Sequence, residues 1–402
     1  MDRPPGSPSD PESATRVGFL RSIAHSILRR RRVLTISRLK FSFVVRIRPT
    51  ISHLIPYDGG PGFEEMSARF GAEGVTMLAG NEYPMPPFPE VGEAIAQAAS
   101  GINRYPDATS TRLREALAET WKVPPECVWT GAGSSEILTT TAQALGGTGT
   151  SMVFPWPSFA MYPINTIYAD SKEIRVPLDS SLKIDLEAMA EAIEPDTTLV
   201  IICNPNNPTG SYLARSDIQA FIDRVPESTL VLVDEAYGEF VAAEGEPSLI
   251  PLSLERPNLA VARTFSKIYG LAGLRVGYLI GQAACLQALR KAQSPFVVGS
   301  VAEAAAVAAL GFQERVRERF ALNRSGIDFL EAELGRRGIE YVPSQANFVW
   351  FRPGERAPQI VQALLEMGTM IRKGTSEWAR VTVGTDAENR RFVRDLDRVL
   401  ST

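Results

Sequence analysis

Histidine and cysteine are scarce in this chain of 402 residues, which has two histidines, His25 and His53, and three cysteines, Cys127, Cys203 and Cys285. A zinc site of cysteine and histidine ligands, a Ser-His-Asp triad, a Cys-His pair and a disulfide framework are therefore all poorly supported. We expect no metal ion. Proton transfer in any enzymatic reaction must then rely on lysine, tyrosine or carboxylate side chains.

Long apolar runs and internal repeats are missing as well. No stretch reaches the roughly 18 apolar residues of a membrane-spanning helix, so an integral membrane protein is not expected. A content of 44% hydrophobic and 22% charged residues suits the core of a two-domain enzyme. The net charge of −4 argues against nucleic-acid binding as the main function.

One lysine, Lys267, lies among hydroxyls, glycines and an arginine in the stretch 263–278. A lysine can form a Schiff base only if apolar surroundings or a nearby cation lower its pKa. Its apolar neighbours and Arg275 are suited to do so, and Arg275 can also bind a phosphate together with Thr264 and Ser266. The stretch indicates a site for an aldehyde cofactor held by its phosphate. A lysine at an ordinary glycine-rich turn is the alternative.

Two apolar runs read as buried strands, and polar residues follow both. Asn207 lies in the turn after residues 199–203, Asp234 ends the second run, and Tyr237 follows it closely. In open α/β sheets the carboxyl ends of strands face the ligand crevice, so these side chains should converge with Lys267. Asp at a strand end is often only a helix cap, but the ordered set is a strong signal.

In these patterns the chain resembles the fold-type I pyridoxal-phosphate enzymes, among them the class I/II aminotransferases and most closely the histidinol-phosphate aminotransferases. The resemblance extends from about Pro56 to the C-terminus. Besides the lysine stretch, it rests on Asn81–Pro84, Arg104–Asp107, Gly131–Glu136, Pro157–Tyr162, Asn206–Gly210, Asp234–Tyr237, Ala346–Phe348 and Arg380–Gly384.

The resemblance implies a role for each cofactor-binding residue. Lys267 would hold pyridoxal phosphate as a Schiff base and later move a proton, while Asp234 would keep the pyridine nitrogen protonated. Asn207 and Tyr237 would bind the phenolic oxygen, and Phe159 would stack on the ring. The phosphate would be held by Gly133, Ser134 and Ser135 at the start of a helix, and by Thr264, Ser266 and Arg275.

The resemblance also assigns substrate contacts. Arg380 would pair with the α-carboxylate of the substrate, and Arg372 would help to bind a substrate phosphate. For Arg372 a solvated surface arginine is an equal alternative. Tyr57 and Asn81 would line the side-chain pocket. Tyr105 would reach across the interface of a homodimer to the neighbouring active site.

The implied fold is α/β. A large domain over residues 101–300 would carry a mostly parallel seven-stranded sheet, and a smaller α/β domain would combine residues 53–100 and 301–402. The alternation of helical patterns with short apolar strands agrees with this layout.

The expected reaction is a ping-pong transfer of an amino group from L-histidinol phosphate to 2-oxoglutarate. An aromatic amino-acid aminotransferase is the nearest alternative. A phosphothreonine decarboxylase and a non-catalytic cofactor-binding regulator are more distant ones. Phe159 replaces the usual tyrosine of the family pattern, Ala132 an asparagine and Ser135 an acidic residue, and these departures keep the alternative substrates open.

The N-terminal segment differs from the rest. No acidic residue occurs from Ser13 to Tyr57, and Arg29–Arg32 form a basic cluster after a short amphipathic pattern. A mitochondrial-type transit segment, a helix that binds membrane surfaces or anionic partners, and a disordered extension are the three interpretations. We favour a disordered extension over residues 1–52, because its first 15 residues are rich in Pro, Ser and Asp. The expected location is the cytoplasm.

Overall fold

The computed structural model describes residues 45–52, 54–242 and 248–401. Residues 49–402 form one compact unit. Most of the N-terminal extension expected over residues 1–52, including its basic cluster, lies outside the described residues. The first helix of the described part is the short α2 (Pro49–Ser52).

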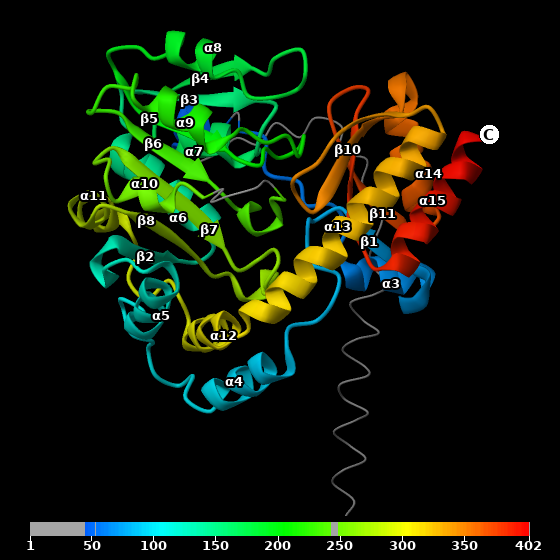
Figure 1. Cartoon of the computed structure of the whole chain (residues 1–402), viewed down its shortest axis with the longest axis horizontal. Helices are drawn as coiled ribbons and strands as arrows, with labels where there is room; N and C mark the ends of the chain where they lie inside the picture. The colour runs from blue at the N-terminus through cyan, green and yellow to red at the C-terminus, as the bar shows by residue number, and fades with distance from the viewer. Residues whose placement is uncertain (1–44, 53, 243–247, 402) are drawn as a thin grey trace, which may run out of the picture. The chain divides into compact units, whose positions relative to one another are not determined.

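A seven-stranded sheet forms the larger of two sheets (Figure 1). Neighbouring strands are parallel from β4 to β7, and only β8 runs antiparallel to its two neighbours, β7 and β2. The predicted fold class, a mostly parallel seven-stranded sheet in an α/β protein, is confirmed. In spatial order the strands are β2 (Val128–Gly131), β8 (Gly277–Gly281), β7 (Leu259–Thr264), β6 (Leu230–Asp234), β5 (Thr197–Cys203), β3 (Ser151–Trp156) and β4 (Lys172–Pro177).

Both faces of this sheet are buried. Successive residues of each strand point to opposite sides, and each of the two sets lies in its own apolar cluster. In β6, Val231 and Val233 belong to one apolar cluster, while Leu230 and Leu232 belong to another. Helices on the first face are α4 (Pro89–Ala99), α5 (Thr111–Trp121), α8 (Leu186–Glu191), α9 (Arg215–Ile222), α10 (Ile250–Ser253) and α12 (Ser300–Leu310). Those on the second face are α6 (Ser134–Leu145), α7 (Met161–Tyr168) and α11 (Ala283–Leu289).

A five-stranded sheet has its own core. Its strands, in spatial order, are β1 (Thr76–Leu78), β11 (Thr369–Lys373), β12 (Ala379–Thr382), β10 (Phe348–Arg352) and β9 (Glu340–Val342). It is covered by α13 (Gln313–Arg336), α14 (Ala357–Glu366) and α15 (Asp386–Leu400), with α3 (Phe63–Phe70) beside β1 and β11.

The long helix α13 joins the two sheets (Figure 1). Its early residue Val316 lies in the core of the larger sheet, whereas Ile327 and Leu330 lie in the core of the smaller one. Single helical turns of the 3-10 type lie in the connections, at η1 (Ala72–Gly74), η2 (Pro125–Cys127), η3 (Gly238–Phe240), η4 (Ala272–Leu274), η5 (Arg290–Ala292) and η6 (Gly354–Arg356).

The packing bears on where the predicted domains would begin and end. Val91 in α4 and Ala305 in α12 are buried in the core of the seven-stranded sheet. Both helices lie in segments that were predicted for the smaller domain. We propose that they belong with the larger sheet, and the division into domains otherwise stays a prediction.

Among the described helices, none is both long enough and apolar enough to span a bilayer.

Candidate active site

A cavity of about 550 Å³ opens at the carboxyl ends of β5, β6 and β7, and the side chains that line it come from both sheets. Asp234 ends β6, Thr264 ends β7, and Cys203 ends β5. Parallel neighbours bring their carboxyl ends to one edge, which explains this convergence. The predicted site residues that line the cavity are Tyr57, Asn81, Ser134, Ser135, Phe159, Asn207, Asp234, Tyr237, Thr264, Ser266, Lys267, Arg275, Arg372 and Arg380.

Asp234 is a buried carboxylate with neutral partners. Its side chain is 2% exposed, and its Oδ2 accepts a hydrogen bond of 3.0 Å from the Tyr162 hydroxyl. Its Oδ1 accepts a hydrogen bond of 3.2 Å from the Ala236 N–H. Burial raises the pKa of Asp234 to about 6, although these hydrogen bonds oppose the rise. A cation placed against this carboxylate would stabilise its charged form.

Lys267 follows β7 and is partly exposed to the cavity. Its Nζ donates a hydrogen bond of 3.3 Å to the Gly80 carbonyl. Burial lowers the pKa of Lys267 to about 8, and the nearby charges of Arg380 and Arg275 act in the same direction, while Glu82 opposes them. The unprotonated fraction of the amine near neutral pH is therefore much larger than for an ordinary lysine, as a nucleophilic lysine requires.

The Tyr237 hydroxyl is the centre of an amide network. It accepts hydrogen bonds from the Asn81 side-chain amide at 2.9 Å and from the Asn207 side-chain amide at 3.2 Å. Asn81 has a φ of 53°, a left-handed conformation that residues with a side chain rarely adopt. The Thr382 hydroxyl holds it there by accepting from the Asn81 N–H and donating to its Oδ1, both at 3.0 Å.

A cradle of guanidinium, hydroxyl and backbone groups lies where α6 begins. Gly133 precedes the helix with a φ of 81°, and an added Cβ would lie 2.5 Å from a guanidinium nitrogen of Arg275. Arg275 in turn donates to the Ser266 hydroxyl at 3.2 Å. One guanidinium at a helix N-terminus, beside several hydroxyls, favours a dianionic group. The hydroxyl side chains that line the cavity there are Ser134, Ser135, Thr264 and Ser266.

One row of side chains crosses three strands of the smaller sheet. Arg372 in β11 lies opposite Arg380 in β12, and Arg380 lies opposite Trp350 in β10. Cross-strand partners share one face of a sheet, and these three line the cavity. The Arg372 guanidinium carbon lies 5.3 Å from the centre of the Tyr57 ring.

Arg380 is only 8% exposed. It donates to the Asn207 Oδ1 and, at 2.7 Å, to the Ala79 carbonyl, while its Nε has no partner among the described residues. Burial lowers the pKa of Arg380 to about 10, and the charge of Arg372 adds to this effect. Two opposed cations, one of them buried, are stabilised by an anion between or beside them.

Two predicted aromatic residues, Phe159 and Tyr105, differ in their relation to the cavity. The Phe159 ring lines it and meets the Tyr162 ring edge-on, with 5.7 Å between centroids. Tyr105 does not line the cavity of its own chain. It is 83% exposed and stacks on the exposed ring of Phe296, with 4.8 Å between centroids. Its predicted contact with a partner subunit stays a prediction.

Several residues of the site were not predicted. Tyr162, which donates to Asp234, lies within one of the matched motifs, so that motif was the available signal. Glu82 also lies within a matched motif and lines the cavity. Trp350 and Lys373 line it as well, and no sequence signal pointed to either. Among the described residues, no group of three His, Cys, Asp or Glu side chains could hold a metal ion.

Comparisons with known proteins agree with this geometry. The family model for aminotransferases of class I and II matches residues 73–396. The chain is 40% identical over 358 residues to the histidinol-phosphate aminotransferase of Symbiobacterium thermophilum, covering 88% of this chain and 98% of that protein. It is 42% identical over 316 residues to the aromatic amino acid aminotransferase of Thermobifida fusca, covering 79% and 88%.

A solved structure is similar along nearly the whole chain. It is the histidinol-phosphate aminotransferase from Sinorhizobium meliloti in complex with pyridoxal 5′-phosphate, with a TM-score of 0.83 and 28% identity. The match covers 90% of this chain and 99% of that one.

The fold and the site define a fold-type I pyridoxal-phosphate enzyme. The chain belongs to the class I and II aminotransferase family. The residues present fit the cofactor, because Asp234 is a buried carboxylate whose charged form a ring cation would stabilise. The Arg275 cradle suits its phosphate, and Lys267 has the lowered pKa of an amine that can bond to its aldehyde.

Proposed function

We propose that this aminotransferase takes its amino group from L-histidinol phosphate and passes it to 2-oxoglutarate. The observation that carries the proposal is the pair Arg372 and Arg380, opposite each other on the cavity wall. Histidinol phosphate offers a phosphate and no α-carboxylate, whereas 2-oxoglutarate offers two carboxylates. A site that must accept both in turn needs two separate cationic positions.

Each residue around the cofactor would have a separate role in the reaction. When bound, pyridoxal phosphate supplies the aldehyde carbon that accepts the amino group and a ring that withdraws electrons from the substrate α-carbon. Lys267 would remove the proton from that α-carbon and deliver a proton to the carbon that carried the aldehyde. Asp234 would keep the ring nitrogen protonated. Asn207 and Tyr237 would bind the phenolic oxygen of the cofactor, and the hydrogen bonds from Asn81 and Asn207 hold the Tyr237 hydroxyl in place.

The other groups would bind and orient. Arg275, with the hydroxyls beside it, would hold the cofactor phosphate. Arg380 would pair with the α-carboxylate of 2-oxoglutarate or glutamate, with its orientation fixed by Asn207 and the Ala79 carbonyl. Arg372, backed by the Tyr57 ring, would bind the phosphate of histidinol phosphate.

An aromatic amino acid is the second candidate for the donor. The aromatic amino acid aminotransferase of T. fusca has about the same identity to this chain as the histidinol-phosphate aminotransferase of S. thermophilum, although over a shorter stretch. Aromatic side chains also line the cavity, among them Tyr57, Phe159 and Trp350. Such a donor would use Arg380 for its carboxylate and would leave Arg372 without an anionic partner.

Single-turnover half-reactions distinguish the two donors. The variants are Arg372→Ala, Arg380→Ala and a distant control, Lys172→Ala, whose cation lies on the exposed strand β4. Arg372→Ala should slow the half-reaction with histidinol phosphate about a hundredfold and that with glutamate far less. Arg380→Ala should slow the half-reaction with glutamate by a similar factor. The control should change neither.

A different outcome would replace the proposal. If phenylalanine or tyrosine is the better donor and Arg372→Ala leaves its turnover unchanged, the enzyme is an aromatic amino-acid aminotransferase. Arg372→Lys adds a geometric check, since a lysine keeps the charge but loses the two-pronged contact with a phosphate.

We also propose a homodimer in which Tyr105 serves the partner's active site. Support comes from the exposed aromatic pair Tyr105 and Phe296, which does not contribute to the cavity of its own chain. Mixed dimers of Tyr105→Ala and Lys267→Ala subunits should regain activity, because one of their two sites then has both residues. Mixed dimers as inactive as the two parents would contradict the shared site.

A further inference from the structure

A buried ion pair lies where β6 and β7 end, on the face of the seven-stranded sheet that packs against α5. Arg263 and Glu235 are each 3% exposed. The Nε and one terminal nitrogen of Arg263 donate to the same Glu235 oxygen, at 3.0 and 2.7 Å. Glu235 also accepts from the Ser248 hydroxyl at 2.8 Å and the Leu249 N–H at 2.7 Å. The proposed mechanism uses neither of these charged groups.

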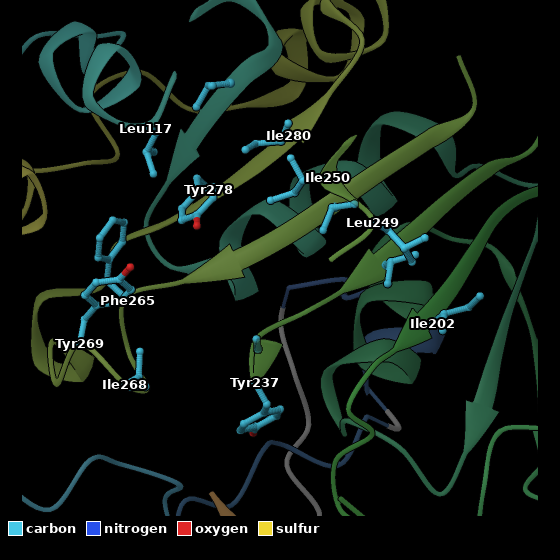
Figure 2. Packing of buried hydrophobic residues seen from close by; sticks show 14 of the residues in the cluster. Leu117, Ile202, Tyr237, Leu249, Ile250, Phe265, Ile268, Tyr269, Tyr278 and Ile280 are labelled. Atoms are coloured by element: carbon cyan, nitrogen blue, oxygen red, sulfur yellow. The ribbon is translucent and has the colours of Figure 1, made fainter. Parts of the chain in front are cut away.

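The surroundings of this pair are closely fitted. The Arg263 guanidinium carbon lies 4.8 Å from the centre of the Trp121 ring. A second carboxylate, Glu239, has its Oε1 3.0 Å from a terminal nitrogen of Arg263. An added Cβ on Gly238 would lie 2.7 Å from the guanidinium carbon, so no other residue fits there without a shift. Figure 2 shows the apolar cluster of this face, to which Leu249 and Tyr278 belong.

Strand alternation connects the pair to the active site. Glu235 follows Asp234 directly, and Arg263 directly precedes Thr264. Because successive side chains of a strand point to opposite faces, Asp234 and Thr264 point to the cavity side while their neighbours point away from it. The Glu235 N–H donates to the Ala262 carbonyl at 2.9 Å, so the pairing of β6 with β7 continues to this point.

We propose that Arg263 and Glu235 are positioning residues for the cofactor site. Their ion pair fixes the ends of β6 and β7 in one register, and thereby the two cofactor-binding residues that these ends present. It also neutralises the carboxylate next to Asp234, so that Asp234 can carry the negative charge that the ring nitrogen requires. This inference depends on the cofactor and is independent of the amino donor.

The charge balance around Asp234 supports the second role. Tyr162 from α7, Cys203 from β5, Tyr237 and Lys267 face it, together with Glu235 from its own strand. Among these groups, the charge of Lys267 stabilises the ionised form of Asp234 and lowers its pKa. The charge of Glu235 has the opposite effect and raises the pKa of Asp234. Without the Arg263 charge, the repulsion between the two carboxylates would be uncompensated in a medium of low dielectric constant.

The test measures cofactor affinity against pH in folded holoenzyme. Wild type, Arg263→Met, Arg263→Lys and Glu235→Gln are dialysed at a series of pH values against known concentrations of pyridoxal phosphate, and bound cofactor is measured by absorbance. Melting temperatures are recorded in parallel. Because the cofactor phosphate titrates in the same range, each variant is compared with wild type at every pH.

The two charge-removing variants should shift the profile in opposite directions. Wild-type affinity should fall as the pH drops below about 6, where Asp234 becomes protonated. In Arg263→Met the fall should begin at higher pH, with affinity at pH 7 about tenfold lower. In Glu235→Gln the fall should begin at lower pH. Arg263→Lys should keep the wild-type profile.

Shifts in the same direction, or lower melting temperatures with unshifted profiles, would reduce the pair to a purely structural role and overturn the proposal. If Arg263→Met does not fold, the double variant Glu235→Gln/Arg263→Met takes its place, because it removes both charges together. Its profile should lie closer to wild type than that of Glu235→Gln, and a profile beyond that of Glu235→Gln would also overturn the proposal.

Discussion

The two sides of the cavity differ in how firmly their side chains are held. On the cofactor side, Asp234 is 2% exposed and Asn207 is 9% exposed, and each makes hydrogen bonds at a strand end or in the turn after it. On the donor side, Tyr57 is 53% exposed and Lys373 is also exposed. The groups that would meet the cofactor ring therefore lie on a well-packed edge, whereas Tyr57 and Lys373, on the wall that would meet the donor side chain, are exposed.

The difference indicates where substitutions alter the reaction and where they alter the substrate. A group fixed by burial and several hydrogen bonds acts on every donor alike, because every donor meets the same cofactor. A group such as Arg372, backed by the exposed Tyr57 ring, acts only on donors that reach it. Changes on the two sides should thus separate into losses of rate and changes in preference.

The largest effect is expected on the cofactor side, at Lys267. Lys267→Ala should lose transamination by about a thousandfold or more with every donor, because the group that moves the α-proton is gone. Borohydride treatment of wild-type holoenzyme followed by peptide mapping should find the cofactor mass on Lys267 and nowhere else. An unmodified Lys267 in that map would remove the assignment of this residue.

Asp234 should be next. Asp234→Ala should retain the cofactor with lower affinity and lose about a hundredfold to a thousandfold in kcat, because charge that develops in the transition state loses its fixed counter-charge. Asp234→Asn is the matched control for shape, and it should be nearly as slow if the charge matters. Near-normal turnover of Asp234→Asn would mean that another group holds the ring nitrogen.

The same contrast explains how much the sequence could predict. Lys267, Asp234 and Asn207 were predictable because parallel strands deliver their carboxyl ends to one edge, whatever the details of the packing. Trp350 was not, since its place beside Arg380 depends on the register of β10 against β12, which local sequence does not determine.

The packing of α4 and α12 against the larger sheet could not be predicted for a related reason. The sequences of α4 and α12 do not say which sheet covers their apolar side chains. Both helices bury apolar side chains against the larger sheet. The ion pair of Arg263 and Glu235 likewise joins two strands, and neither residue alone carries a signal for it.

A substitution at Gly374 tests whether the donor side of the cavity can be changed without any effect on the cofactor side. An added Cβ there would lie 2.0 Å from the Trp350 ring and 2.6 Å from the Trp378 carbonyl, so the turn between β11 and β12 must shift. Gly374→Ala should raise KM for the donor about fivefold to tenfold, as expected for a loss of about 1 kcal/mol or slightly more in binding. Cofactor affinity should stay unchanged. Gly92→Ala, with open space around it, is the control.

Lys267 should also reduce the stability of the cofactor-free protein. The pKa of Lys267 is lowered to about 8 from its ordinary 10.5, so between these values the unfolded chain binds more protons than the folded one. The free energy of unfolding therefore rises with pH across that window, and the cost of the buried charge is fully present below about pH 8. Lys267→Met should raise Tm at pH 7 by on the order of 2 °C, with a smaller gain near pH 10. Lys172→Met, at an exposed ion pair, should give no gain.

The smallest effect is expected where neither side of the cavity is touched. A chain that starts at Pro49, the first residue of the compact unit, should keep its cofactor spectrum, its oligomeric state and kcat within about twofold. A chain that starts at Phe63 is the matched control. It lacks Tyr57, the ring behind Arg372, so the half-reaction with a phosphorylated donor should weaken while cofactor binding persists. Loss of folding on removal of residues 1–48 alone would make them part of the enzyme, and a change only in membrane association or import would support a targeting role. An unchanged donor preference in the shorter chain would mean that the exposed segment around Tyr57 does not shape the donor side.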